Sequence, residues 1–196
     1  MTDVQRRSEP LRVLTVCSHN RTRSVMMAAL LESLLGEQLG GGAVQVMSSG
    51  FGPVDLPPIP DAVDAMHRRG LDVAAHLSTT TTADLLDGAD LVLTAERDHV
   101  VRIAALSRNA FARTMTLPEF LSSAASSDSG HGHGDVRSWV HSLTVHRTPV
   151  EYLRGSIGEV ADPTGLPSRA FESAVAVIEQ QCREAAMWLA SLQLGA

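Results

Sequence analysis

The chain has 196 residues, of which 44% are hydrophobic, and this length and composition suit one globular domain. Its formal net charge is -6, which argues against a broad basic face for nucleic acid. No stretch approaches the length of a membrane-spanning helix, and residues 1–10 lack the apolar core of a signal peptide. We therefore expect a cytoplasmic protein without membrane insertion.

Short apolar runs alternate with helical patterns along the chain. The runs predict four strands, at residues 11–16, 43–49, 90–94 and 113–117. Apolar stripes, caps and stop signals predict helices at residues 24–39, 61–69, 83–86, 96–106, 136–146 and 169–192. We predict an α/β fold, a three-layer sandwich in which a four-stranded parallel sheet of order 2-1-3-4 has helices on both faces.

Two regions stand apart from that alternation. Residues 1–10 are expected to form a disordered or loosely attached tail before a single domain over residues 11–196. Residues 122–155 form an extended segment, and the part at 122–135 is rich in Ser, Gly and His, which predicts a surface loop. Two histidines and an aspartate within residues 131–135 lack the spacing of a zinc site, so we expect no metal there.

The loop that follows the first strand carries the strongest functional signal. Cys17 ends the strand, and Arg23 closes the loop six positions later, where a helix begins. Unpaired N–H groups at a helix N-terminus stabilise anions, thiolates included. Successive N–H groups between the two residues can form an anion nest, and the Arg23 fork matches two phosphate oxygens. The pattern predicts a phosphate cradle with Cys17 as nucleophile, against the alternative of a buried structural cysteine near a surface arginine.

The whole loop is expected to surround the phosphate, and its remaining members are Ser18, His19, Asn20, Arg21, Thr22 and Ser24. The Ser24 hydroxyl can donate to the sulfur, and Asn20 tolerates left-handed backbone geometry. His19 and Arg21 either contact the anion or face solvent. We favour solvent, because most side chains point away from a nest that is built of backbone N–H groups.

The loop resembles the signature of the low-molecular-weight protein tyrosine phosphatases, Cys-x-Gly-Asn-x-Cys-Arg-Ser-Pro. Four positions match: Cys17, Asn20, Arg23 and Ser24. Three positions depart: His19 replaces the glycine, Thr22 the second cysteine and Val25 the proline. Shorter matches extend over most of the chain, among them Ser48-Ser49-Gly50, Gly70-Leu71-Asp72 and Asp162-Pro163-x-Gly165.

The resemblance implies further roles. Asp162 would be the general acid, and the proline after it favours an extended aspartate backbone, although Asp-Pro also begins ordinary turns. His76 would brace Asn20, the alternative being a surface histidine. Phe51 is a candidate pocket wall, with packing as an equal alternative.

We therefore predict a cysteine-dependent phosphatase that hydrolyses phosphotyrosine or aryl phosphate through a phosphocysteine, with no cofactor. Its partners would be a phosphorylated protein and the product inorganic phosphate, and the oligomeric state stays open. One alternative is a single-cysteine arsenate reductase that uses an external thiol. The external thiol would be needed because Thr22 stands where a second loop cysteine would be, and Cys182 is predicted to lie on the inward, buried face of the last helix. Another is a catalytically silent phosphate-binding module, since His19 and Thr164 depart from the family.

Overall fold

The computed structural model of the chain describes residues 9–126, 136–144 and 147–194. Its strands are β1 (Leu11–Cys17), β2 (Val44–Gly50), β3 (Leu91–Thr94) and β4 (Thr114–Thr116). They form one sheet in the order β2-β1-β3-β4, and all three pairings are parallel. The predicted fold class and strand order are confirmed.

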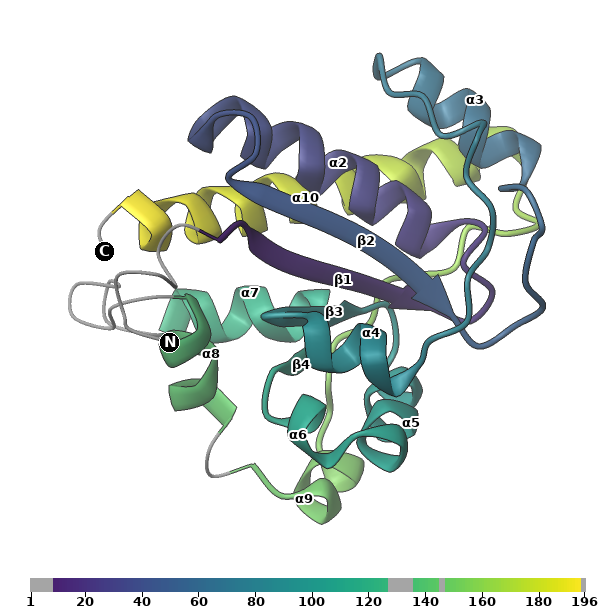
Figure 1. The fold of residues 1–196 in the computed structure, drawn as a ribbon. Helices are drawn as coiled ribbons and strands as arrows, with labels where there is room; N and C mark the ends of the chain where they lie inside the picture. The colour runs from purple at the N-terminus through teal and green to yellow at the C-terminus, as the bar shows by residue number, and fades with distance from the viewer. Residues whose placement is uncertain (1–8, 127–135, 145–146, 195–196) are drawn as a thin grey trace.

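Helices cover both faces of this sheet (Figure 1). On one face lie α2 (Arg23–Leu39), α3 (Pro60–His67), α7 (Leu117–Ser126), α8 (Val136–Thr144) and α10 (Ser168–Leu194). On the other lie α4 (Ala83–Gly88), α5 (Arg97–Leu106) and α6 (Arg108–Phe111). The short helix α9 (Pro149–Arg154) lies beside α5. None of the helices described is both long and apolar enough to span a membrane.

The central strand β1 shows why these layers form. Its side chains alternate between the faces, so that Leu11 and Val13 join the core under α2 and α10, whereas Leu14 and Val16 join the core under α4, α5 and α6. All four side chains are buried. The carboxyl end of β1 is therefore held from both sides, and Cys17 stands at that end.

Several boundaries differ from the prediction. Residues 122–126 are helical, as the end of α7, although their composition predicted a loop. Serine is compatible with this helix because its hydroxyls bond to backbone carbonyls one turn back, Ser122 Oγ to Pro118 O at 3.0 Å and Ser126 Oγ to Ser122 O at 2.8 Å. Helices α6 and α9 were not predicted. Most of the predicted tail, residues 1–8, and the polar stretch 127–135 lie outside the described residues.

Candidate active site

Cys17 lies at the centre of a polar cluster, although the residue is only 3% exposed. Its sulfur is 3.0 Å from Ser24 Oγ and accepts a hydrogen bond from the Asn20 backbone N–H at 3.3 Å. The Asn20 side-chain amide donates to Ser24 Oγ at 3.0 Å, which leaves the serine proton free to point at the sulfur. Two donors thus converge on Cys17, an arrangement that stabilises a thiolate.

Asn20 holds the loop in its curled shape. Its φ of 53° lies in the left-handed region, which asparagine tolerates better than most residues. The buried amide also donates to Ser48 Oγ at 2.8 Å and accepts from the Thr79 N–H at 2.8 Å. Gly50 is required here, because a Cβ at that position would stand 2.7 Å from the Asn20 nitrogen. The loop is thereby fixed to the ends of β1 and β2.

Arg23 is the first residue of α2 and is buried, at 3% exposure. Its Nη1 lies 2.5 Å from Glu96 Oε1 and donates to the Val160 carbonyl at 3.1 Å. Its Nη2 donates to Asp162 Oδ2 at 3.0 Å. A guanidinium has five N–H donors. These contacts with described residues occupy three of them, so the Nε–H and the second Nη2–H stay available to an anion.

Asp162 lies beside Arg23 at the mouth of the loop, and its side chain is 47% exposed. The Thr164 N–H donates to its Oδ1 at 3.0 Å, and the Thr164 hydroxyl lies 3.3 Å from the Thr22 hydroxyl. The structure therefore brings Asp162 to Arg23, although 139 positions separate the two in sequence.

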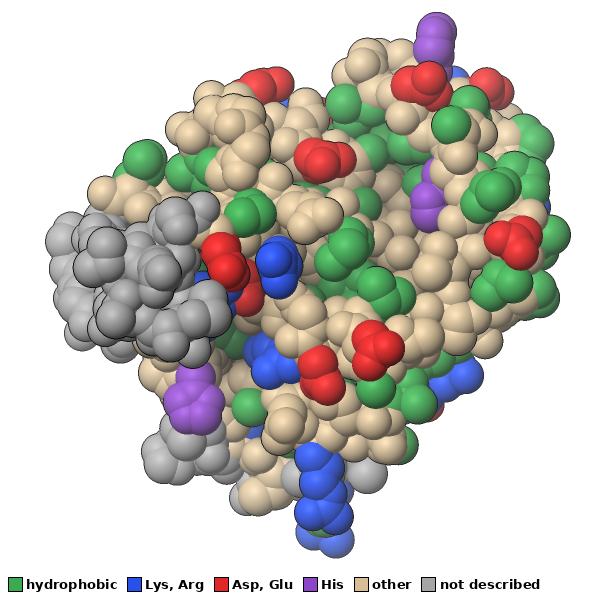
Figure 2. All heavy atoms as spheres, in the orientation of Figure 1, with side chains coloured by type: hydrophobic (Ala, Val, Ile, Leu, Met, Phe, Trp, Pro, Cys, Tyr) green, Lys and Arg blue, Asp and Glu red, His purple; other side chains and the backbone are tan. Residues whose placement is uncertain are grey.

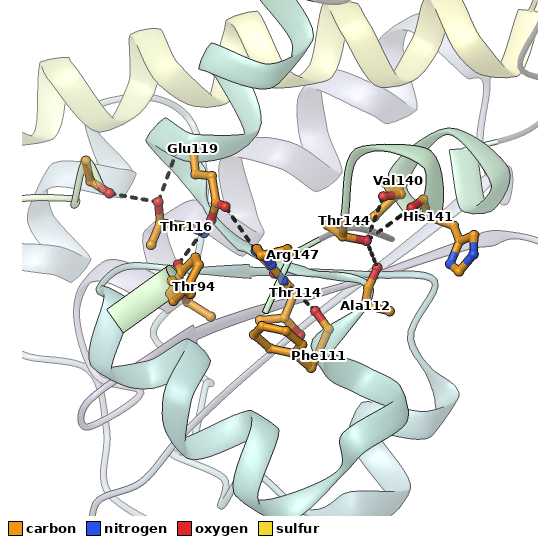
Figure 3. Close-up of polar contacts among 12 residues, drawn as sticks. Thr94, Phe111, Ala112, Thr114, Thr116, Glu119, Val140, His141, Thr144 and Arg147 are labelled. Atoms are coloured by element: carbon orange, nitrogen blue, oxygen red, sulfur yellow. Dashed lines mark hydrogen bonds and ion pairs between the residues drawn. The ribbon is translucent and has the colours of Figure 1, made fainter. Parts of the chain in front are cut away.

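The segment that leads to Asp162 is fixed to the carboxyl ends of β3 and β4. Val160 N donates to Ala95 O at 2.8 Å, and Thr116 Oγ1 donates to Gly158 O at 2.7 Å. Before it, Arg147 forms an ion pair with Glu119 at 2.9 Å (Figure 3). Arg147 also donates to the carbonyl groups at the end of α6 and in β4.

The remaining predicted site residues line the edge of the loop. His76 Nε2 lies 3.0 Å from the Asn20 carbonyl oxygen, so it contacts the backbone of Asn20 rather than the amide. Arg21 points away from the cradle and donates to Pro57 O at 2.6 Å. His19 is exposed and packs against Gly52, where a Cβ would stand 2.5 Å from its ring. Phe51 is half-buried in the core beneath α4, α5 and α6.

Two residues of the site were not predicted, Glu96 and His99. Glu96 pairs with Arg23, as described above. His99 lies in the first turn of α5, is 1% exposed, and its Nε2 is 3.1 Å from Ser18 Oγ. Both follow the carboxyl end of β3, which pairs with β1. That position was the available signal, since ligands of such sheets bind beyond the carboxyl ends of the strands.

Charges of both signs share the face of the molecule that Figure 2 draws. Figure 2 shows arginines (blue) among acidic side chains (red) on the drawn face, rather than one basic field. In the part of the chain that the structure describes, no three His, Cys, Asp or Glu side chains are grouped as metal ligands. The histidines of residues 131–135 lie outside that part.

Fold and loop define the class of the protein: a parallel α/β sheet in which strand β1 ends at a cysteine, followed by a tight loop and helix α2. The sequence pattern described as "Low molecular weight phosphotyrosine protein phosphatase" matches residues 12–136. The chain belongs to that family.

The individual relatives are named either as tyrosine phosphatases or as arginine phosphatases. The probable low molecular weight protein-tyrosine-phosphatase EpsP of Ralstonia solanacearum is 37% identical over 82 residues, which are 41% of this chain and 52% of that protein. The match thus spans about half of EpsP. The protein-arginine-phosphatase of Bacillus subtilis is 30% identical over 125 residues, 63% of this chain and 76% of that protein. The structure of the YwlE arginine phosphatase from Geobacillus stearothermophilus has a TM-score of 0.70 and 28% identity, covering 94% of this chain and 96% of that one.

Proposed function

We propose that this protein is a cysteine-dependent protein phosphatase that acts through a phosphocysteine, with phosphotyrosine as its substrate. The supporting observation is that two hydrogen-bond donors converge on Cys17 Sγ while the Asp162 carboxylate contacts Arg23 within the same site. We place its phosphorylated protein substrate in the cytoplasm, because a working thiolate needs a reducing compartment. No cofactor enters the proposed reaction.

In the first step the Cys17 thiolate attacks phosphorus, forming the P–S bond as the bond to the leaving oxygen breaks. The loop N–H groups and the two available N–H groups of Arg23 bind the equatorial oxygens, where charge develops. Asp162 donates a proton to the leaving oxygen. In the second step Asp162 takes a proton from water, the water oxygen attacks phosphorus, and the P–S bond breaks to release phosphate and the thiolate.

A phosphoarginine residue is the second candidate substrate. It is favoured by the arginine phosphatases among the relatives, one of which matches nearly the whole chain in structure. The same steps then cleave a P–N bond, and Asp162 protonates nitrogen. Thr164, next to Asp162 on the exposed side of the loop, replaces the aromatic residue that a strict aryl-phosphate preference would favour. Paired phosphotyrosine and phosphoarginine peptides would rank the two substrates by kcat/KM.

Two substitutions test the proposal with para-nitrophenyl phosphate and phenyl phosphate. Cys17→Ser is expected to lower kcat by at least about 10³-fold while inorganic phosphate still binds. Asp162→Ala is expected to lower kcat by about 10²–10⁴-fold, and more for phenyl phosphate, which has the poorer leaving group. Asp61→Asn, on the exposed side of α3, is the matched control.

Some results would contradict the proposal. Turnover that survives Cys17→Ser would exclude the thiolate mechanism, and equal losses for both substrates in Asp162→Ala would exclude the acid. Thiol-dependent arsenate reduction in place of ester hydrolysis would identify a reductase. Phosphate binding without turnover at any pH would identify a silent binding module.

A further inference from the structure

His99 forms hydrogen bonds through both ring nitrogens, one with the backbone of Glu96 and one with the side chain of Ser18. The Glu96 backbone N–H donates to Nδ1 at 3.2 Å, and Nε2 lies 3.1 Å from Ser18 Oγ. Because a backbone N–H can only donate, Nδ1 must be the acceptor. A neutral imidazole with an unprotonated Nδ1 carries its proton on Nε2, so Nε2 donates to the Ser18 hydroxyl. The geometry fixes the tautomer.

One partner of His99 lies at the start of the phosphate loop, and the other contacts the residue at its end. Ser18 follows Cys17 directly and begins the run of backbone N–H groups. Glu96 carries the carboxylate that lies 2.5 Å from Arg23, the residue that closes the loop. A single buried ring therefore connects the start of the loop, through a hydroxyl, with the backbone of the residue that holds its end.

The surroundings keep this ring neutral and in place. Burial lowers the pKa of His99 below the value of about 6.5 that is usual for imidazole. Glu96 and Asp98 act in the opposite direction, and Arg23 and Arg102 act in the same direction as burial. The Phe51 ring stacks on His99 with centroids 5.9 Å apart and planes at 25°, and the Arg102 guanidinium lies over the Phe51 ring, 4.0 Å from its centroid.

We propose that His99 is a positioning residue of the phosphate loop, which as the Nε2-protonated neutral ring sets the place of Ser18 and of Glu96, and so the spacing between the loop amides and Arg23. The inference rests on the proposed function in that the loop binds phosphate. It does not require turnover. His99 acts through its neighbours and contacts no reacting atom.

Substitutions of His99 can test its two hydrogen bonds one at a time. In His99→Asn the short amide can still accept from the Glu96 N–H, but it does not reach Ser18. In His99→Gln the longer amide can reach Ser18, but it offers no acceptor at the position of Nδ1. His99→Phe removes both bonds and keeps the stacking on Phe51. Each is combined with Ser18→Ala, and His67→Asn on the exposed face of α3 is the matched control.

The readout is the Kd for inorganic phosphate by calorimetry, with para-nitrophenyl phosphate kinetics measured beside it. His99→Phe and Ser18→Ala are each expected to raise the Kd by roughly 5–10-fold, because both remove the hydrogen bond between His99 and Ser18. In the Phe and Asn variants, which lack the bond to Ser18, adding Ser18→Ala should not raise the Kd further. In the Gln variant, which can keep that bond, adding Ser18→Ala should still raise the Kd. KM is expected to follow the Kd, and His67→Asn to bind as the wild type.

Multiplicative effects of Ser18→Ala and His99→Phe, or wild-type affinity in every His99 variant, would overturn the inference. Nitrogen-15 NMR of the wild type gives a measure that does not depend on the variants folding. It should show a neutral, Nε2-protonated His99 at pH 7.5, above the usual imidazole pKa of about 6.5, and a proton on Nδ1 would also overturn the inference. If the wild-type protein binds phosphate but does not hydrolyse the ester, the proposed function is wrong. The inference about His99 is then decided by the same Kd values.

Discussion

Arg23 connects the parts of the candidate site that come from different regions of the chain. It contacts Glu96 after β3, Val160 in the segment after α9, and Asp162 in the loop before α10. We call that loop the acid loop, after the proposed role of Asp162. A buried guanidinium needs such partners, because an uncompensated charge at 3% exposure would be costly. The same partners orient the group, so the N–H donors that make no contact with described residues are held in place for the anion that we propose it binds.

Thr22 is the basis for a prediction about the oxidation of Cys17. Its hydroxyl contacts Thr164, and it stands where the family's second cysteine would supply a neighbouring thiol. A sulfenic acid on Cys17 without a nearby thiol proceeds to the irreversible sulfinic state. After prolonged peroxide, the wild type is expected to regain less than about a tenth of its activity with dithiothreitol. Thr22→Cys should regain most of it.

Mass spectrometry of the Cys17 peptide checks this expectation, since it separates sulfinic acid from disulfide. Thr22→Ser is the control, because it keeps a hydroxyl and adds no thiol. If the wild type regained its full activity with dithiothreitol after prolonged peroxide, the prediction would be contradicted.

At the scale of elements, Arg147 ties the segment before the acid loop to α6, β4 and α7. It donates to Glu119, to Phe111 O at 2.5 Å and to Thr114 O at 2.7 Å, and its side chain is only 11% exposed. Its guanidinium also lies over the rings of Phe111 and Tyr152. Glu119 accepts a hydrogen bond from the Tyr152 hydroxyl as well, and burial raises the pKa of that tyrosine.

Arg147→Met is expected to lower the free energy of unfolding by about 3 kcal/mol, because it leaves the Glu119 carboxylate buried without its cation. Urea denaturation measures the loss, and Arg154→Met at the exposed end of α9 is the control. Hydrogen exchange at Val160 N–H should become faster, since that amide bonds to Ala95 O just before the acid loop. A loss below about 1 kcal/mol would show that the pair does not hold this segment.

The turn that follows α3 is joined to α10 by ion pairs that respond to pH. Glu172 lies 2.7 Å from Arg69 and 2.6 Å from Arg68, and hydrogen bonds from Arg69 and then Arg68 lower the pKa of Glu172. A carboxyl whose pKa is lower in the folded state stabilises the fold above its unfolded value of about 4.3. That contribution is lost as the pH falls through the folded value. Because Glu172 is 40% exposed, solvent screening limits it to less than about 1 kcal/mol.

The expected outcome is that Glu172→Gln lowers Tm at pH 6–7 by about 1–4 °C and that the difference disappears near pH 3. Glu184→Gln is the control on the same helix, because Glu184 bonds to the uncharged Gln180. A difference in Tm that stays constant down to pH 3 would show that the effect is not electrostatic.

The sequence predicted those elements that depend mainly on the residues within them. The apolar run of β1 and the stripe of α2 were predicted to within one residue, and Cys17 and Arg23 followed from their spacing. Helix α7 was missed because its stability comes from packing: Phe120 meets Trp139 of α8 edge-on, with centroids 5.4 Å apart. Glu96 was missed for the same kind of reason, since only the pairing of β1 with β3 brings it to Arg23.

At the scale of the whole molecule, α10 is the longest helix described and closes one face of the core. It packs on α2, α3, α7 and α8. Its inward stripe was predicted from helical spacing, and the packing of Cys182 within it is confirmed, because that side chain is 0% exposed. Such a residue reaches solvent only when the packing of several helices opens together.

Cys182 therefore reports global unfolding. Burial raises the pKa of its thiol well above the usual range, so both exposure and ionisation are withheld in the folded state. Native Cys17→Ser protein is expected to react with a maleimide at only about 10⁻³–10⁻⁶ of the rate found in urea, which is the fraction of time a marginally stable domain spends unfolded. The Arg147→Met variant should react faster by the factor that its loss of unfolding free energy dictates, about 10² for 3 kcal/mol. Equal rates in the native and urea-unfolded protein would show that α10 opens separately from the rest of the core.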